Sequence, residues 1–283
     1  FGYANGAYPE NYGGGMINII GSPTLRNIVF YGNSAEIGGG VFTYQGNTVL
    51  TNVIFASNIA THYGGGMYSH TSNPILNNVI FSENTSQEGA GMYNYLSNFS
   101  MSNVTFYSNA TSLSSSGRGG GIYNYQSSPT IINSTITGNS ARYGGGIFNY
   151  NQSVPILTNT TIADNTADLA AANGGGIYNS SNCSTTIRNA ILWGNAPDQI
   201  FGSATATYSD IQDGYAGTGI IDQDPLLAQL VYDGGFILIQ PIIFGSPAID
   251  AGDPENCPAT DQRGYSRPID GDGDGVASCD MGS

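Results

Sequence analysis

The sequence predicts an all-β fold, a right-handed single-stranded parallel β-helix whose coils of about 25 residues stack into a solenoid with an irregular acidic C-terminal end. A triplet of small residues recurs along the chain, and two asparagines follow each triplet, always six residues apart. The third residue of the triplet recurs at spacings of 25, 26, 25, 30, 25 and 30 residues, at Gly15, Gly40, Gly66, Gly91, Gly121, Gly146 and Gly176. This period is typical of stacked coils that share one core.

The asparagines form two columns. The first is Asn27, Asn52, Asn78, Asn103, Asn133, Asn159 and Asn189, and the second is Asn33, Asn58, Asn84, Asn109, Asn139, Asn165 and Asn195. Stacked coils bring equivalent side chains together, so each amide can hydrogen-bond to the amide of the next coil. We therefore predict a structural asparagine ladder along the first column, and the second column can form another.

Each repeat contains three apolar columns, represented in one copy by Met67, Leu76 and Phe81. Apolar and polar residues alternate around these positions, which is the period of a β-strand. Glycine and asparagine occupy the bends because both tolerate left-handed backbone angles. A leucine-rich repeat would need more leucine and a β-propeller a longer repeat, so neither fits.

Three regions are expected along the chain. Residues 1–197 form regular coils, with loop insertions at 111–117 and 168–172 in the two places where the glycine spacing reaches 30 residues. Residues 198–245 form terminal coils of irregular sequence, and residues 246–283 form an acidic segment. Residues 1–12 contain no amphipathic helix that would cap the first coil, so we expect open strand edges there.

The charge distribution limits the partners. The net charge is −14, only 9% of the residues are charged, and lysine is absent. Fourteen of the 20 acidic residues lie between Asp198 and Asp280. Such a chain repels phosphate backbones, so we expect no nucleic acid partner. It also contains no run of 18 apolar residues, so we expect no membrane span.

The cysteines predict one disulfide. Cys257 and Cys279 bracket a short acidic segment, and they are expected to pair in an oxidising compartment. Cys183 is then left as a small buried residue.

The segment between the paired cysteines predicts a structural calcium ion. Aspartates alternate with glycines from Asp270 to Gly275, which places three carboxylates on one side of a turn. The expected ligands are Asp270, Asp272, Asp274 and Asp280. A solvated acidic turn is the alternative, and the flanking sequence does not match an EF-hand.

Aromatic residues form two columns next to the glycine triplets. Alternation sends both columns to the outer face of the sheet if the neighbouring apolar column points inward. The predicted binding surface is Tyr44, Tyr68, Tyr93, Tyr95, Tyr123, Tyr125, Tyr150 and Tyr178. Such a surface can contact a sugar or a protein. In the alternative, the rings only stack on one another and shield the sheet.

No enzyme active site is predicted. A glycosidase requires two carboxylates on one face, and Glu36, Glu83 and Glu88 share no column in the sequence. His62 and His70 have no evident acid partner. Ice binding would require a regular threonine face, and the candidate column that runs from Val29 to Ile191 mixes apolar residues with threonine.

Two sets of motifs resemble known families. Gly-Gly-Gly-Ile-Tyr at Gly119–Tyr123, together with Phe-x-x-Asn at Phe30–Asn33, resembles polymorphic outer-membrane protein repeats. The resemblance implies a surface-displayed β-helix that acts as an adhesin. Asp224–Leu226, Gly245–Asp253 and the stretch that begins at Asp261 resemble choice-of-anchor-type bacterial surface proteins, which usually carry an anchoring tail.

These observations predict a secreted protein, extracellular or at the cell surface, with a structural or adhesive role and self-association end to end into fibres. The alternative is a carbohydrate-binding surface module that contacts a glycan or a host cell-surface ligand through the tyrosines. A polysaccharide lyase or hydrolase is the less favoured third possibility.

Overall fold

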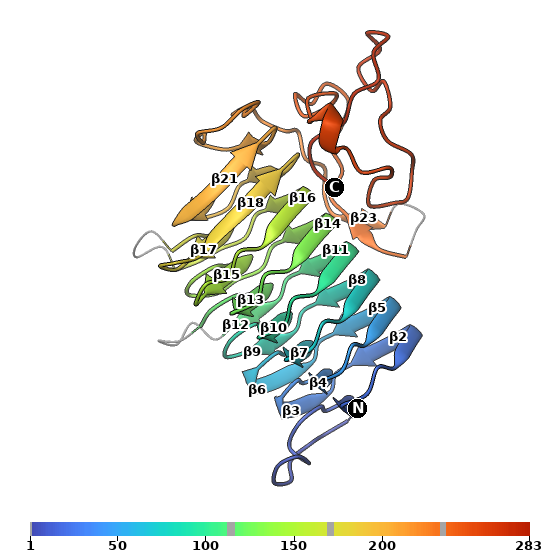
Figure 1. The fold of residues 1–283 in the computed structure, drawn as a ribbon, viewed down its shortest axis with the longest axis vertical. Helices are drawn as coiled ribbons and strands as arrows, with labels where there is room; N and C mark the ends of the chain where they lie inside the picture. The colour runs from blue at the N-terminus through green and yellow to red at the C-terminus, as the bar shows by residue number, and fades with distance from the viewer. Residues whose placement is uncertain (1, 112–116, 169–172, 233–235) are drawn as a thin grey trace.

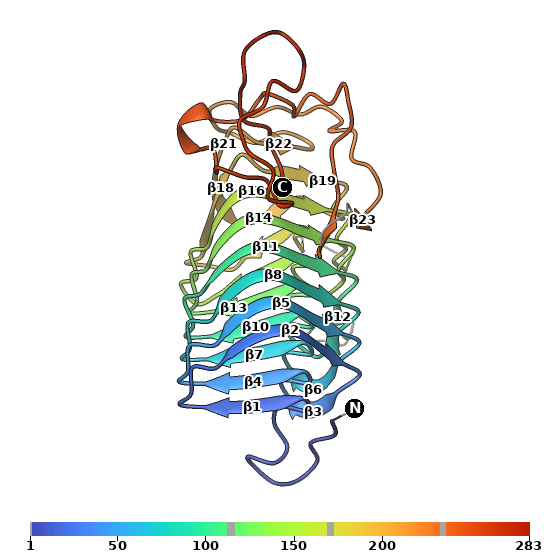
Figure 2. The same cartoon turned by 90° about the vertical axis from the view of Figure 1, so that its right-hand side faces the viewer.

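The chain winds as a stack of coils with parallel strands (Figures 1 and 2). The structure is a computed structural model that describes residues 2–111, 117–168, 173–232 and 236–283. Most of the two expected insertions, 112–116 and 169–172, lies outside the described residues. The predicted all-β parallel β-helix is confirmed.

The strands of successive coils form three parallel sheets. The first comprises β1 (Met16–Ile19), β4 (Val41–Tyr44), β7 (Met67–His70), β10 (Met92–Tyr95), β13 (Ile122–Tyr125), β15 (Ile147–Tyr150), β17 (Ile177–Asn179) and β20 (Ile200–Phe201). The second comprises β2 (Thr24–Tyr31), β5 (Val49–Ala56), β8 (Ile75–Ser82), β11 (Ser100–Tyr107), β14 (Thr130–Thr137), β16 (Ile156–Ala163), β18 (Ser184–Arg188) and β21 (Ser203–Thr207), with β19 (Ile191–Trp193) and β22 (Asp210–Ile211) beside them. The third comprises β3 (Ser34–Ile37), β6 (Ile59–Tyr63), β9 (Thr85–Ser86) and β12 (Ala110–Thr111).

The register of the sheets stacks equivalent residues of the repeat. Met92 pairs with Met67 on one side and with Ile122 on the other. The apolar columns therefore meet inside the coil and form one continuous core. Within it the phenyl ring of Phe81 stacks on those of Phe55 and Phe106, with centroids 4.6 Å apart in both pairs.

The small-residue triplet is required by close packing between coils. Gly64 has φ +67°, a left-handed angle that side chains disfavour. A Cβ atom at Gly66 would lie 2.5 Å from the carbonyl oxygen of Gly91 and 2.8 Å from the ring of Phe81. Larger residues there would force neighbouring coils apart, which explains why the triplet returns in every coil.

The continuous asparagine ladder is the second column, not the first. The amide of Asn84 donates to Asn109 Oδ1 at 2.9 Å, and Asn109 donates to Asn139 Oδ1 at 2.9 Å. The same oxygens accept backbone N–H groups, and the amides also donate to core carbonyls such as Phe81 O at 2.8 Å. This buried ladder runs from Asn33 to Asn195.

The first column forms a ladder only at its start, which corrects the prediction. Asn52 donates to Asn27 Oδ1 and Asn78 donates to Asn52 Oδ1. Asn103 turns instead to Asn77, and later members bind the C-terminal residues. All seven are left-handed, with φ between 47° and 55°: Asn27, Asn52, Asn78, Asn103, Asn133, Asn159 and Asn189. Backbone conformation therefore explains this column better than an amide ladder does.

A third ladder lies in the first sheet and was not predicted. Asn124 donates to Asn149 Oδ1 at 2.9 Å and accepts from Asn94 at 3.1 Å. Asn149 in turn donates to Asn179 at 2.8 Å. These side chains are buried within the coil. Their position three residues after the triplet was visible in the sequence, but earlier coils place Thr43 and Ser69 there.

The coils end earlier than predicted. The last parallel pairing of the stack joins Asp210 to Ile221. From residue 222 the chain leaves the stack and folds back beside the second sheet (Figures 1 and 2). The short strands β23 (Val231–Tyr232) and β24 (Leu238–Ile239) pair antiparallel there, and the 3₁₀ helix η1 (Pro254–Asn256) follows. Residues 222–245 are therefore not terminal coils. We call residues 222–232 and 236–283 the strap.

The strap covers the outward column of the second sheet that mixes apolar residues with threonine. Its apolar end meets apolar coil residues, because Ile237 and Ile239 pack against Ile80. Near the last coils, Ala248 and Met281 pack against Ile191 in the same way. The described strap thus covers the column at Ile80 and at Ile191, whereas Val29 at its start stays exposed.

The middle of the same column is threonine, and the strap supplies polar groups there. Gln262 Nε2 donates to Thr105 Oγ1 at 3.1 Å, and Thr135 Oγ1 donates to Gln262 Oε1 at 2.7 Å. The backbone N–H of Ser283 donates to Thr161 Oγ1 at 3.1 Å. The mixed composition of the column therefore matches the strap residue by residue.

Candidate functional site

The aromatic column closest to the triplets is a continuous stack of rings. We call it the inner aromatic column, and it comprises Phe42, Tyr68, Tyr93, Tyr123, Phe148 and Tyr178. The rings of Tyr93 and Tyr123 lie 4.5 Å apart and 8° from parallel. The rings of Phe148 and Tyr178 lie 4.9 Å apart. Coil-to-coil spacing holds each ring at a stacking distance from the next.

Most of the inner column is buried, which corrects its predicted place in a binding surface. Tyr68, Tyr93 and Tyr123 are no more than 8% exposed. Burial is the largest cause that raises the pKa of all three phenols, so they stay neutral. The alternation of side-chain directions along a strand correctly predicts that these side chains point away from the coil interior. It does not reveal that Tyr63 and neighbouring residues before the triplets fold over them.

The second aromatic column remains partly exposed. We call it the outer aromatic column, and it comprises Tyr44, His70, Tyr95, Tyr125 and Tyr150. The centroids of Tyr95 and Tyr125 lie 4.9 Å apart, and those of Tyr125 and Tyr150 lie 5.5 Å apart. Because faces meet faces between Tyr95 and Tyr125, the facing sides of the two rings are covered. Burial lowers the pKa of His70, which therefore stays uncharged at neutral pH.

A row of charged groups lies beside the aromatic columns and was missed in the sequence. Glu88 pairs in the sheet with Tyr63 on one side and Arg118 on the other. Arg118 Nη1 donates to Glu88 Oε1 at 2.6 Å. His62 Nδ1 lies 3.6 Å from Glu36 Oε1, so His62 does have an acid partner. These residues all lie just before a glycine triplet, and counting back from the triplets would have placed them in neighbouring columns.

Desolvation controls the ionisation of Glu88. The residue is 8% exposed, and burial raises the pKa of its carboxyl. The charge of Arg118 and the hydrogen bond from it oppose that rise. The guanidinium of Arg118 also lies 5.7 Å from the centroid of the Phe148 ring. The pair therefore joins the charged row to the inner aromatic column.

The acidic turn assembles differently from the predicted calcium site. Carboxylate oxygens of Asp250, Asp270 and Asp272 lie within 4.8 Å of one another, whereas Asp274 and Asp280 are outside this cluster. Asp280 instead accepts the N–H of Asp250 at 2.9 Å. Asp250 comes from a separate stretch of the chain, so the local alternation around Asp270 gave no sign of it.

Backbone N–H groups already satisfy much of the negative charge in this turn. Asp250 Oδ2 accepts from the N–H groups of Gly271 and Asp272, each at 2.9 Å. Asp270 accepts from Gly273 at 2.7 Å and from Gly275 at 3.0 Å. A turn held this way does not require an ion, so calcium at this place stays a prediction.

A family comparison matches these coils. The model described as right handed beta helix region matches residues 39–213, more than half of the chain. The chain belongs to the right-handed beta helix family. The predicted handedness is thereby confirmed, whereas the finer likeness to polymorphic outer-membrane or choice-of-anchor proteins stays a prediction. No match was found among curated proteins or among solved structures.

In this right-handed beta helix the charged row holds its ionisable side chains in pairs. Arg118 donates a hydrogen bond to Glu88. His62 Nδ1 lies near the carboxylate of Glu36 and 3.3 Å from the hydroxyl oxygen of Thr61. A depression of about 460 Å³ beside them is lined by Ala60, Thr61, Thr85, Ser86, Gln87, Ala110 and Thr111. Its hydroxyl and amide side chains donate and accept hydrogen bonds but include no general acid. A second depression, of about 410 Å³, is lined in part by Glu36 and His62, which are groups able to transfer protons. That the protein is not an enzyme stays a prediction.

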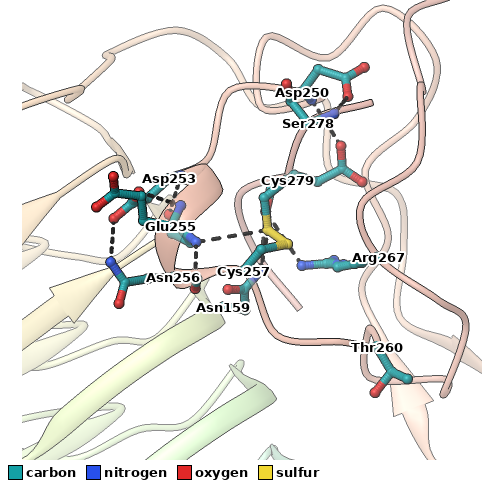
Figure 3. The surroundings of a disulfide bond; sticks show 12 residues. Asn159, Asp250, Asp253, Glu255, Asn256, Cys257, Thr260, Arg267, Ser278 and Cys279 are labelled. Carbon is teal, nitrogen blue, oxygen red and sulfur yellow. Dashed lines mark hydrogen bonds between the residues drawn. A yellow bond between two sulfur atoms is a disulfide. The ribbon is translucent and has the colours of Figure 1, made fainter. Parts of the chain in front are cut away.

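The predicted disulfide of this right-handed beta helix is present within the strap, where it lies against the coils (Figure 3). Cys257 and Cys279 are bonded, and Cys183 is free and buried as expected. Asn159 and Asn189 both direct their amide groups to Cys279 Sγ at 3.8 Å. Asn159 also donates to the carbonyl of Asp280 at 3.1 Å. The last members of the first asparagine column thus bind the strap at its disulfide.

The described residues contain no helix long and apolar enough to cross a membrane.

Proposed function

We propose that this right-handed beta helix is an extracellular structural or adhesive protein that presents the outer aromatic column to a glycan or to another cell-surface ligand. The single observation that carries the proposal is the partial exposure of this column along successive coils. Within the described part of the chain, the hydroxyls of Tyr95 and Tyr125 have no hydrogen-bond partner, so both are free to bind one.

The geometry favours a ligand that is extended along the axis of the stack. Successive coils lie about 4.8 Å apart, and the ring centroids of Tyr95 and Tyr125 follow that spacing at 4.9 Å. The stacked faces are already in contact, so a sugar would meet hydroxyls and ring edges. A linear glycan with repeating hydroxyls fits such a row better than a compact ligand does.

Two further features support an extracellular location and a role without catalysis. The disulfide between Cys257 and Cys279 is the kind of bond that persists in oxidising compartments. The charged row consists of groups that neutralise one another, as Arg118 and Glu88 do. Both features fit a rigid surface protein.

Binding of the purified full chain to a glycan array and to cells tests the proposal. The double variant Tyr95→Ser/Tyr125→Ser should bind about tenfold more weakly, because two hydroxyls and two ring edges are lost. Tyr232→Ser is the matched control, since Tyr232 is exposed on strand β23 of the strap. Equal binding by wild type and the double variant would remove the outer column as the contact surface.

The same protein tests the proposed end-to-end self-association. Its support is that β1 and β2 are edge strands of the described sheets and expose Ile17, Ile19 and Val29. Filaments in electron micrographs should disappear when charged residues replace Ile17 and Ile19. Discrete particles at every concentration of the wild-type protein would contradict this part.

A further inference from the structure

The outer aromatic column brings phenols of successive coils into contact. Tyr95 and Tyr125 occupy paired positions of β10 and β13. Their ring centroids lie 4.9 Å apart, and the two planes are 22° from parallel. Tyr125 also pairs with Tyr150 of β15, where the centroids lie 5.5 Å apart and the planes are 50° from parallel. Phenols from three coils therefore form one row of neighbouring rings.

This row can be reached from solvent, whereas the inner aromatic column cannot. Tyr95 and Tyr125 are half-buried, and Tyr150 is 44% exposed. The rings of Tyr93 and Tyr123 lie closer together, at 4.5 Å, but these residues are only 6% and 3% exposed. Side chains near the surface change rotamer quickly, and close packing prevents this for buried ones. A reagent in solution can therefore attack the outer row, and its rings can tilt toward each other.

We propose that the outer aromatic column is a site of oxidative modification, in which Tyr125 is coupled covalently to Tyr95 or to Tyr150 as dityrosine. The co-substrate is a peroxide, used by a peroxidase of the oxidising compartment in which the disulfide of the strap persists. The chain contains no lysine, so it cannot cross-link its coils through a side-chain amine. The proposal goes beyond the proposed function, because it requires no ligand on the column.

The coupling is balanced by one molecule of hydrogen peroxide. The oxidant removes one electron and one proton from each of the two phenols. The resulting phenoxyl radicals form a carbon–carbon bond between the Cε atoms next to their oxygens. Each bonded Cε then loses its hydrogen as a proton, and the phenol oxygen of the same ring takes up a proton. Both phenols are restored, and the peroxide is reduced to two water molecules.

The same column contains a position where this reaction is not expected. Tyr44 occupies the equivalent position in β4, but the ring next to it is that of His70, with centroids 4.9 Å apart. His70 is in turn the neighbour of Tyr95, with centroids 4.7 Å apart. Dityrosine requires two phenols, so the contact of Tyr44 with His70 cannot form it. The coupling is therefore confined to the part of the column around Tyr125.

Treatment of the purified full chain with hydrogen peroxide and a haem peroxidase, without any glycan, tests the proposal. The chain is kept dilute, so that coupling between molecules is suppressed. Monomers should lose the mass of two hydrogen atoms and gain dityrosine fluorescence, and peptide mapping should place the bond at Tyr125. The coupled monomer should also melt at a higher temperature, because the bond restricts the unfolded chain.

Two substitutions make the test specific. Tyr125→Phe removes the phenol that both pairs share but keeps the ring, so it should fold as wild type does and lose most of the dityrosine fluorescence of the monomer. Tyr44→Phe is the matched control in the same column and should keep the wild-type yield. Circular dichroism checks that both variants fold.

Three outcomes would overturn the proposal. The first is a wild-type monomer whose mass does not change. The second is a wild-type yield of dityrosine in Tyr125→Phe. The third is a bond that maps only to tyrosines in edge-to-face contact, such as Tyr8 with Tyr12. Each outcome is read without a ligand, so it leaves the proposed binding of a glycan to be decided by its own experiment.

Discussion

The two asparagine columns lie six positions apart and have the same period, but they stabilise the fold in different ways. In the buried column each side chain accepts and donates, as Asn109 does with Asn84, Asn139 and the carbonyl of Phe81. In the other column the side chain is secondary, and the left-handed backbone is what recurs, as at Asn103 with φ 55°. A repeated residue therefore does not define a repeated interaction. At the half-buried Asn103 the backbone angle is what recurs, whereas the buried Asn159 and Asn189 of the same column use their amides to bind the strap.

The largest expected effect separates these two columns directly. Asn109→Gly should lower the free energy of unfolding by about 3–5 kcal/mol, because several buried donors and acceptors lose their partner at once. Asn103→Gly should change it by less than about 0.5 kcal/mol, since glycine adopts the left-handed angle freely. Chemical denaturation monitored by circular dichroism measures both.

The same two variants can also contradict the distinction between Asn109 and Asn103. Equal losses of stability would mean that the half-buried amide of Asn103 matters as much as the fully buried one of Asn109. In that case the set of amide bonds would not be the property that distinguishes these two residues.

A smaller effect is expected where the first column meets the strap. Asn189 is buried, accepts the N–H of Asp253 at 2.7 Å and donates to the carbonyl of Asn256 at 3.3 Å. Asn189→Gly keeps the left-handed angle but removes these bonds, so it should cost about 1–3 kcal/mol. Hydrogen exchange should show faster exchange in the strap around Asp253. Unchanged protection there would show that the other strap contacts, such as that of Gln262 with Thr135, hold the strap without Asn189.

The smallest expected effect concerns the charged row, where the burial of Glu88 makes the stability depend on pH. Glu88 has a raised pKa, so the folded chain holds this proton more tightly than the unfolded chain. Its contribution to stability therefore falls as the pH rises from the ordinary carboxyl value through the raised one. Glu88→Gln should flatten this part of the plot of melting temperature against pH. An unchanged slope in the Glu88→Gln variant would contradict this expectation.

The fold could be predicted from the sequence because the residue pattern that encodes it repeats. Each coil restates the glycine triplet and the apolar columns, and the registers that pair Met67 with Met92 follow from the period alone. The disulfide was accessible for a different reason, since only three cysteines exist and two bracket one short segment. In both cases the decisive information is local or periodic.

The structural features that the sequence did not predict depend on contacts that occur once in the chain. Tyr93 was assigned to a surface because alternation gives the face of a sheet but not what folds over that face. The partnership of Asp250 with Asp270 joins segments that are 20 positions apart and share no repeat. The path of the strap likewise follows from unique contacts, such as Gln262 with Thr135, for which no period exists.

The matched column beneath the strap also limits how the molecule can change in length. An open solenoid accepts an additional coil anywhere, because each coil contacts only its neighbours. Here Ile80 and Ile191 meet opposite parts of one strap. Duplication or deletion of a coil between them would shift every later contact by about 4.8 Å and bring threonines under isoleucines. Growth by coil duplication is therefore compatible with this strap only before Ile80, where Val29 is left uncovered.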